Sequence, residues 1–420
     1  INKTNGETGS IEITNIGTGS TAGVGGTVEI GNENTSSLTL DGTLYLTNGT
    51  TVYEASSSGN AISIEGGTNV TISTQDDSLH LDNANIVLNN SANGTTTIST
   101  GTGAGDLTID GNIVGTGGKS ESLTILSGTG DVTITGSIGL TQAVNNLTIN
   151  ASQAGDVTMG SIGTTSAVGV SGTTEIGNTN TAAIALTGAA YNTTGSQKYS
   201  ATSGGNITIS GTAAEFATAN NNIEFDESGV SLANNGTTTI DTGSGAGAVT
   251  FDGAVDGNDT TVNDGLKVIS GSGAVTFTGA VGGTHELDEL LVNQQGDTGV
   301  GAGAITFSAA IGAGGQTGVV GTTAIGNANT TSITFSNGTL KFTGATTFRA
   351  SDNVGESNDD ANIEIAAATT IETNAGTFTV TGSKLDLANN ANLTVNSLGG
   401  AISISGIEGA GDETVTINAN

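Results

Sequence analysis

Few residues of this chain have side chains suited to acid–base or metal chemistry at a defined site. Its 420 residues include two histidines, His80 and His285, and no cysteine. His80 stands in Leu79-His-Leu81, where the alternation of a strand places its side chain on the outside. His285 precedes an acidic segment at 286–289, but no second histidine follows at the spacing of a helical zinc site. We interpret both histidines as solvated surface groups.

Acidic pairs in turn-like contexts are the best candidate ligands, and the ion that they suit is calcium. The pairs are Asp76 with Asp77, Asp226 with Glu227, and Asp359 with Asp360. Oxygen ligands on loops match the preference of a hard cation. The glycine-rich nonapeptide of calcium-binding β-rolls is absent, so unliganded surface carboxylates are the alternative. We expect no other cofactor.

Basic residues bear on whether the chain is an enzyme. Solenoid enzymes that cleave acidic polysaccharides place a basic group beside their carboxylates, to stabilise developing negative charge. The seven basic residues here are scattered along the chain: Lys3, Lys119, Lys198, Lys267, Lys341, Lys384 and Arg349. We therefore predict no catalytic site, and keep a polysaccharide-active enzyme as an alternative.

The elements that carry these residues repeat along the sequence. A segment of the form Gly-Thr-x-x-Ile-Gly-Asn begins at Gly26, Gly172 and Gly321, with spacings of 146 and 149 residues. Internal repetition at a fixed period is typical of stacked architectures, in which each unit buries its apolar face against its neighbours. We divide one elongated domain into the end of a repeat unit (1–25), two full units (26–171 and 172–320) and an incomplete third (321–420). We expect the copies to superpose rung by rung.

A finer period of 25 residues lies inside the long one. Triplets such as Leu107-Thr-Ile109 recur at Val132-Thr-Ile134 and Val157-Thr-Met159, each preceded by Gly-Asp. Two further short apolar elements follow within each period. Period-2 alternation turns the two apolar side chains of a triplet inward and its threonine outward. The pattern predicts an all-β protein, a parallel β-solenoid (β-helix) with three short strands per rung of about 25 residues. At that length, 420 residues make roughly 17 rungs.

This pattern also predicts which side chains are buried. Val132, Ile134, Val249, Phe251, Val275 and Phe277 should lie in the core, and Thr133, Thr250 and Thr276 should face outward. Two segments with weak helical character, 212–219 and 285–291, are expected in loops that bulge from the solenoid.

Composition and charge agree with a narrow solenoid. The chain has 69 glycines, no proline, no tryptophan and 3% aromatic residues. Proline is disfavoured in central strands because they use every backbone N–H. The net charge of −32 makes nucleic acid and anionic membranes poor partners. No apolar run reaches the ~18 residues of a membrane span.

The subrepeats resemble those of a known group of proteins. Segments such as Gly105-Asp-Leu-Thr-Ile109 and Gly247-Ala-Val-Thr-Phe251, tiled over nearly the whole chain, are similar to the β-strand-repeat bacterial surface proteins. These include filamentous-haemagglutinin-like adhesins and some surface-layer proteins. The resemblance implies an exported, right-handed parallel β-solenoid that serves as a stalk, adhesin or surface filament. No haemagglutinin secretion-domain signature is present.

These observations together predict an extracellular structural protein of prokaryotic type, a subunit or segment of a cell-surface filament or adhesin shaft. The chain starts and stops part-way through a repeat, so we expect end-to-end assembly with copies of itself or continuation of a longer chain. Surface glycans are a second expected partner. A glycan-binding module is the main alternative, and Tyr45, Tyr53, Tyr191 and Tyr199 would favour it if they clustered on a flank.

Overall fold

The fold is an all-β parallel solenoid. The computed structural model describes residues 8–19, 23–57, 61–91, 93–118, 120–150, 152–258, 263–297, 301–351, 363–409 and 411–419. The described residues form strands and no helix. The strands are stacked in about 15 turns of about 26 residues each. The predicted fold class is confirmed. There are fewer turns than the roughly 17 expected, because several loops lengthen the turn beyond 25 residues. The chain divides into two compact units, Ile1–Ile207 and Thr208–Asn420.

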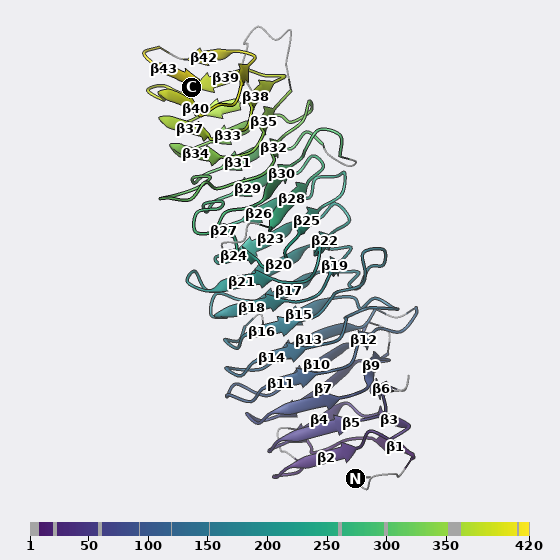
Figure 1. Ribbon diagram of the computed structural model, residues 1–420. Coiled ribbons are helices and arrows are strands. Elements are labelled where there is room, and N and C mark those ends of the chain that lie inside the picture. The colour runs from purple at the N-terminus through teal and green to yellow at the C-terminus, as the bar shows by residue number, and fades with distance from the viewer. Residues whose placement is uncertain are drawn as a thin grey trace. The chain divides into compact units, whose positions relative to one another are not determined.

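Unit 1 has three parallel sheets, whose strands run from purple to teal in Figure 1. The first sheet stacks β1 (Ser10–Ile13), β3 (Ser37–Leu40), β6 (Ala61–Ile64), β9 (Asn85–Leu88) and β12 (Ile113–Val114). Parallel bridges continue it through Ile138 and Ile162 to β19 (Ala190–Asn192). The second sheet stacks β4 (Leu44–Thr47), β7 (Asn69–Thr74), β10 (Thr95–Ser99), β13 (Ser122–Leu126), β15 (Leu147–Ile149), β17 (Thr174–Gly177) and β20 (Gln197–Ser200). The third sheet stacks β2 (Val28–Gly31), β5 (Thr51–Glu54), β8 (Leu79–Asp82), β11 (Leu107–Ile109), β14 (Val132–Ile134), β16 (Val157–Met159) and β18 (Ala183–Leu186). β21 (Asn206–Ile209) lies at the boundary of the two units.

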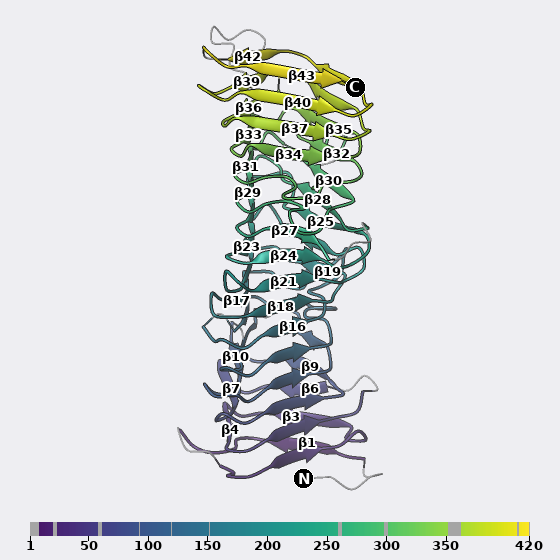
Figure 2. The same ribbon diagram turned by 60° about the vertical axis from the view of Figure 1, so that its left-hand side comes forward.

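Unit 2 is built in the same way, and the stack of β34, β37, β40 and β43 is seen in green and yellow in Figure 2. One sheet holds β22 (Glu215–Ala217), β25 (Thr237–Asp241), β28 (Gly265–Ile269), β30 (Glu289–Val292), β32 (Thr323–Ile325), β35 (Thr346–Arg349), β38 (Phe378–Thr381) and β41 (Ile402–Ile404). A second holds β23 (Ile223–Asp226), β26 (Val249–Phe251), β29 (Val275–Phe277), β31 (Ile305–Phe307), β33 (Ile333–Phe335), β36 (Ile363–Ile365), β39 (Leu385–Leu387) and β42 (Ile407–Gly409). The third side holds β24 (Gly229–Leu232) and β27 (Val255–Gly257). Bridges through Val281 and Ile311 continue it to β34 (Thr339–Phe342), β37 (Thr369–Thr373), β40 (Leu393–Ser397) and β43 (Val415–Ala419).

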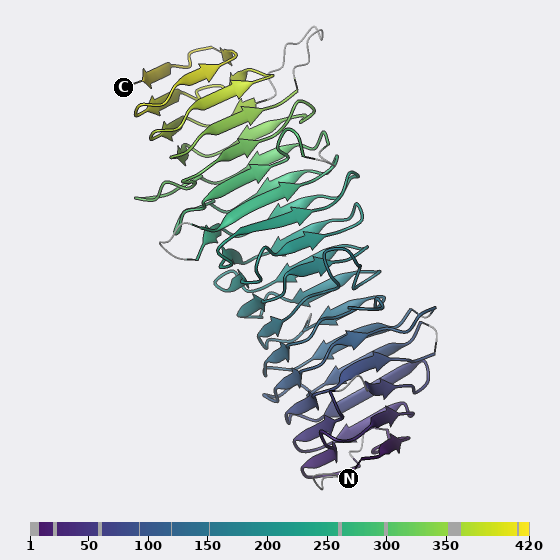
Figure 3. The same ribbon diagram turned by 45° about the vertical axis from the view of Figure 1, so that its right-hand side comes forward.

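Residue alternation sets the register of each ladder. In β11, β14 and β16 the first and third residues are buried and the central threonine is partly exposed. Equivalent positions pair directly, with Thr108 opposite Thr133 and Thr133 opposite Thr158. A slip by one residue would turn every apolar side chain of a strand outward, so burial fixes this register. Figure 3 shows strands of successive turns running in the same direction within each unit.

The core is a narrow column of like residues. The six apolar residues predicted to be buried are at most 1% exposed, while Thr133, Thr250 and Thr276 are partly exposed, which confirms the prediction. In unit 2 the rings of Phe225, Phe251, Phe277, Phe307 and Phe335 stack on successive turns, with centroids 5.1, 5.0, 4.7 and 5.4 Å apart. All nine phenylalanines and all four tyrosines are buried.

The sequence repeat does not span a whole number of turns. At about 26 residues per turn, 146 residues make between five and six turns. Within unit 1, β2 and its equivalent β17 therefore lie in different sheets, as do β5 and β20. The described parts of 26–171 and 172–320 each contain fifteen strands, β2–β16 and β17–β31. The copies thus agree in strand number, and equivalent strands such as β2 and β17 lie in different sheets of the solenoid.

Both segments predicted to bulge as loops contribute strands instead. Residues 215–217 form β22 with Phe216 in the core, and 289–292 form β30. Among the described residues there is no helix of the length and apolarity needed to cross a membrane.

Candidate functional site

His80, Asp82 and Asp110 converge on the outer face of unit 1. β8 has the sequence Leu-His-Leu-Asp, and its alternating burial turns His80 and Asp82 outward together. Asp110 directly follows β11, and its backbone N–H donates to the carbonyl of Leu81 at 3.2 Å. His80 pairs with Thr108 across the two strands, so Asp110 comes level with Asp82 on the next turn. The three side chains therefore come from two hydrogen-bonded turns held in fixed register.

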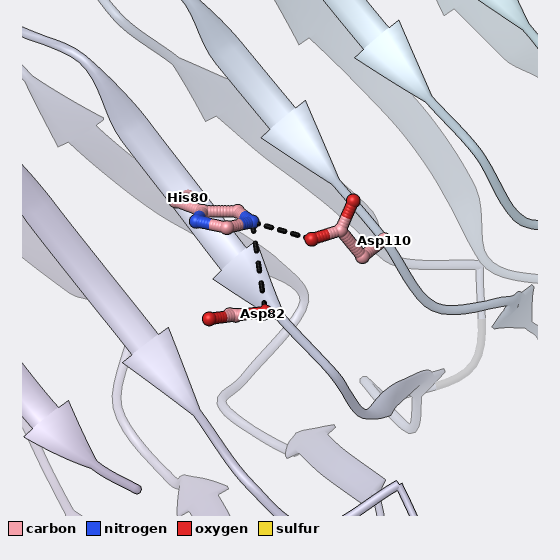
Figure 4. A group of neighbouring side chains, drawn as sticks. All are labelled: His80, Asp82 and Asp110. Atoms are coloured by element: carbon pink, nitrogen blue, oxygen red, sulfur yellow. Dashed lines mark hydrogen bonds and ion pairs between the residues drawn. The ribbon is translucent and has the colours of Figure 1, made fainter. Parts of the chain in front are cut away.

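The side chains face one another closely (Figure 4). His80 Nε2 lies 2.7 Å from Asp110 Oδ2 and 3.8 Å from Asp82 Oδ1. One nitrogen or oxygen atom from each residue lies within 4.8 Å of the other two. The side chains are about one third exposed, so the group is open to solvent and to small ions.

A third carboxylate stands in the same outward column. Glu54 of β5 is in register with Asp82 of β8, so Glu54, Asp82 and Asp110 follow one another on three successive turns. Asn83 adopts a left-handed conformation (φ 64°), and its side-chain amide donates to Glu54 Oε1 at 3.2 Å. Like charges placed opposite each other on neighbouring strands repel.

The pKa of Asp82 reflects this crowding. Partial burial raises it above its ordinary value, the nearby His80 lowers it, and the Glu54 and Asp110 carboxylates raise it further. The net shift of the Asp82 pKa is upward, and partial burial is its largest cause. The site thus has more negative charge than its own residues neutralise.

Unit 2 has a second cluster of the same backbone design, formed by Glu224, Asp226 and Asp252. β23 reads Ile-Glu-Phe-Asp with the same alternation, so Glu224 and Asp226 point outward together. Asp252 follows β26, and its N–H donates to the carbonyl of Phe225 at 3.0 Å. The three carboxylate oxygens lie within 4.8 Å of one another, and all three residues are partly exposed. This group offers oxygen donors only.

The described residues of the predicted calcium pairs have different surroundings. Asp76 Oδ1 accepts hydrogen bonds from the backbone N–H groups of Thr102 and Gly103, at 2.8 and 2.6 Å, so it caps a turn. The backbone carbonyl of Asp77 accepts the Thr74 hydroxyl.

Asp226 groups with Glu224 and Asp252, whereas its sequence neighbour Glu227 lies in a left-handed turn (φ 66°) outside that group. Asp359 and Asp360 lie outside the described residues.

His285 lies beside acids that the fold already uses. Its carbonyl accepts the N–H of Gly257 at 3.2 Å. Glu286 Oε1 accepts both the N–H and the hydroxyl of Thr317, each at 2.8 Å. Leu287 between Glu286 and Asp288 is buried.

Several described lysines pair with an acid on the following turn. Lys267 Nζ lies 2.7 Å from Asp297 Oδ1, Lys341 Nζ lies 3.9 Å from Glu372 Oε2, and Lys384 pairs with Glu408. These pairs sit on different turns of unit 2, and each one neutralises a local carboxylate.

Two carboxylates of the described residues are buried, at equivalent corners of the two units. Asp264 is 4% exposed, and its carboxylate accepts the N–H groups of Asn234, Asn235 and Asn258 at 3.1, 2.8 and 3.3 Å. Glu121 is 0% exposed, and one of its oxygens accepts a backbone N–H at 3.3 Å. Its Oε1 has no hydrogen-bond partner among the described residues.

The alternation around His80 predicts a solvated surface group and does not by itself indicate the neighbouring aspartates. The signal that would have identified the cluster is a triplet followed by aspartate on two consecutive rungs, Leu79-His-Leu-Asp82 and Leu107-Thr-Ile-Asp110. Residues at matching positions of neighbouring rungs become direct neighbours in a parallel ladder. No protein family, curated protein or solved structure matches this chain.

Proposed function

We propose that this protein is an extracellular structural protein, a subunit or segment of a cell-surface filament or adhesin shaft. It acts through self-assembly and surface attachment, most simply outside a prokaryotic cell. Its principal partner is another copy of itself, joined end to end, or further turns of a longer chain.

The observation that carries this proposal is the stacking of like residues on successive turns. In β29, β31 and β33, Val275, Ile305 and Ile333 form one column, and the phenylalanine two positions later forms another. In these strands each turn repeats the buried residues of the turn before it and is joined to it by a parallel ladder. An arrangement of this kind extends by adding turns, as a shaft or filament requires.

An exposed apolar strand, β43, supports the proposal. In β43 all five residues are exposed, and Val415 and Ile417 are 39% and 47% exposed. They stand in register with Leu393 and Val395 of β40, which are fully buried. A further parallel strand placed on β43 would bury these two side chains in the same way.

Other partners and activities are weaker proposals. The four tyrosines that would favour glycan recognition are all buried, so attachment to surface glycans would have to use polar outward side chains. The charge of −32 argues against nucleic acid, and calcium at the surface carboxylates stays a prediction. A catalytic role is not part of this proposal.

Electron microscopy of the purified chain tests the proposal. We expect unbranched rods much longer than one 40.7 kDa chain, and a sedimentation coefficient that rises with protein concentration. The double variant Val415→Lys, Ile417→Lys should shorten the rods, because charges on an edge strand oppose further pairing.

The matched control is Thr133→Lys, Thr276→Lys, which adds the same charge at outward positions within the turns and should leave rod length unchanged. A monomer that stays monodisperse at millimolar concentration and physiological salt would contradict self-assembly.

A further inference from the structure

We propose that His80, Asp82 and Asp110 form a binding site for a divalent transition-metal ion of the zinc type. The site links two successive turns of unit 1, because His80 and Asp82 belong to β8 and Asp110 follows β11. It is independent of the proposed filament role, which requires no metal.

The donor set favours a borderline metal. Imidazole nitrogen together with carboxylate oxygen suits zinc and its neighbours, whereas calcium and magnesium prefer oxygen donors only. The chain places one of its two histidines beside two aspartates from neighbouring turns.

A tetrahedral ion can fit among the three side chains if it replaces the 2.7 Å hydrogen bond between His80 and Asp110. Ligand atoms about 2.0–2.2 Å from zinc lie roughly 3.3–3.6 Å from one another. The observed separations of 2.7 and 3.8 Å from His80 Nε2 bracket that spacing. Small side-chain rotations would bring the three atoms to a common centre, and the partial exposure leaves a fourth position for water.

The backbone holds the donors in place before any ion arrives. Asp110 N–H is bonded to Leu81, between the two outward residues of β8, and the inward Leu79 and Leu81 are at most 1% exposed. A site built on paired strands costs little conformational entropy on binding.

Charge supplies the attraction for a cation. Glu54, Asp82 and Asp110 stand on three successive turns, and the two aspartates face a single imidazole. A divalent ion would relieve their mutual repulsion. Glu54 is in register with Asp82 on the neighbouring turn, where its negative charge adds to the attraction for a cation.

Calorimetric titration of metal-free, full-length protein with zinc chloride tests the site. We expect the wild-type chain to bind zinc, and His80→Gln and Asp110→Asn each to weaken the binding by at least about tenfold. Circular dichroism should show that both variants stay folded, because the substituted side chains point outward.

The matched controls are His285→Gln, which changes the other histidine, and Asp252→Asn, which changes the acidic cluster of unit 2. Both should keep the wild-type affinity. Zinc affinity that is unchanged in His80→Gln, or a wild-type chain that binds no zinc at 100 times the protein concentration, would overturn the proposal.

Discussion

The two outward clusters, one in each unit, share a backbone design and differ in one side chain. In unit 1 the strand carries His80 and Asp82, and Asp110 follows on the next turn. In unit 2 the corresponding positions are Glu224, Asp226 and Asp252. The repeat therefore supplies two aspartates on neighbouring turns in both places. The residue two positions before the first aspartate determines whether the group offers a nitrogen donor or oxygen donors only.

The comparison predicts first that inward and outward positions respond very differently to the same charge. Phe277→Asp in β29 should destabilise unit 2 by at least about 4 kcal/mol, because it removes a stacked ring and buries an unpaired carboxylate. Thr276→Asp, one residue away and outward, should cost less than about 1 kcal/mol. Urea denaturation midpoints measure both. Equal costs would mean that the register deduced from alternation is wrong.

The buried carboxylates give a second comparison of the two units. Asp264→Asn should cost about 2–3 kcal/mol, because charge-assisted hydrogen bonds to three backbone N–H groups are weakened. Glu121→Gln should change the free energy of unfolding by less than about 1 kcal/mol. The buried Glu121 carboxylate accepts one backbone N–H, and its other oxygen has no hydrogen-bond partner among the described residues, so the desolvation cost of the charge is poorly offset. The same urea denaturation measurement compares them. A larger loss at Glu121 would show that its carboxylate has a stabilising partner.

Exchanging the distinguishing side chain sharpens the comparison of the clusters. Glu224→His should raise the zinc affinity of unit 2 by about tenfold, or 1.4 kcal/mol, by adding a nitrogen donor. His80→Glu should lower the affinity of unit 1 by a similar factor. Calorimetric titration of each variant in a chain carrying the other cluster unchanged measures both effects. If both variants bind zinc as the wild type does, the residue at the position of His80 and Glu224 does not control the zinc affinity of its cluster.

The smallest expected effect concerns the pH dependence of the metal-free protein. The raised pKa of Asp82 means that its charged form opposes folding. The protonated Asp82 side chain therefore contributes stability below the unfolded-state pKa of about 3.9. This stability is lost as pH rises through the higher folded-state pKa. Asp82→Asn should therefore raise the melting temperature at pH 7 by on the order of 1 °C in the presence of a chelator, and the gain should vanish near pH 3. A lower melting temperature at pH 7 would show that attraction to His80 outweighs burial and repulsion.

Alternation within short triplets was enough to predict the fold and the buried face of each strand. Val275, Thr276 and Phe277 lie as their sequence pattern requires. Loop length was not predictable to single residues, so the sequence did not show which strands share a sheet. Local propensity was a poor guide at 212–219. The sequence of this segment has weak helical character, but residues 215–217 form strand β22, which buries Phe216 in the core.

The candidate site was missed for a related reason. Sequence reasoning looked for adjacent acids, such as Asp226 with Glu227, but neighbouring side chains of an extended chain point in opposite directions. Groups converge at positions i and i+2 of one strand and at the matching position of the next turn. His80 and Asp110 are 30 residues apart in sequence and in contact in the structure.

X-ray absorption at the zinc edge tests the central claim, that one outward residue sets the donor chemistry on a fixed frame. The zinc-loaded wild-type chain should show first-shell ligands near 2.0 Å together with the outer-shell scattering of one imidazole. His80→Glu should lose the imidazole signal and keep oxygen ligands. An oxygen-only shell in the wild-type chain, identical to that of His80→Glu, would contradict the account.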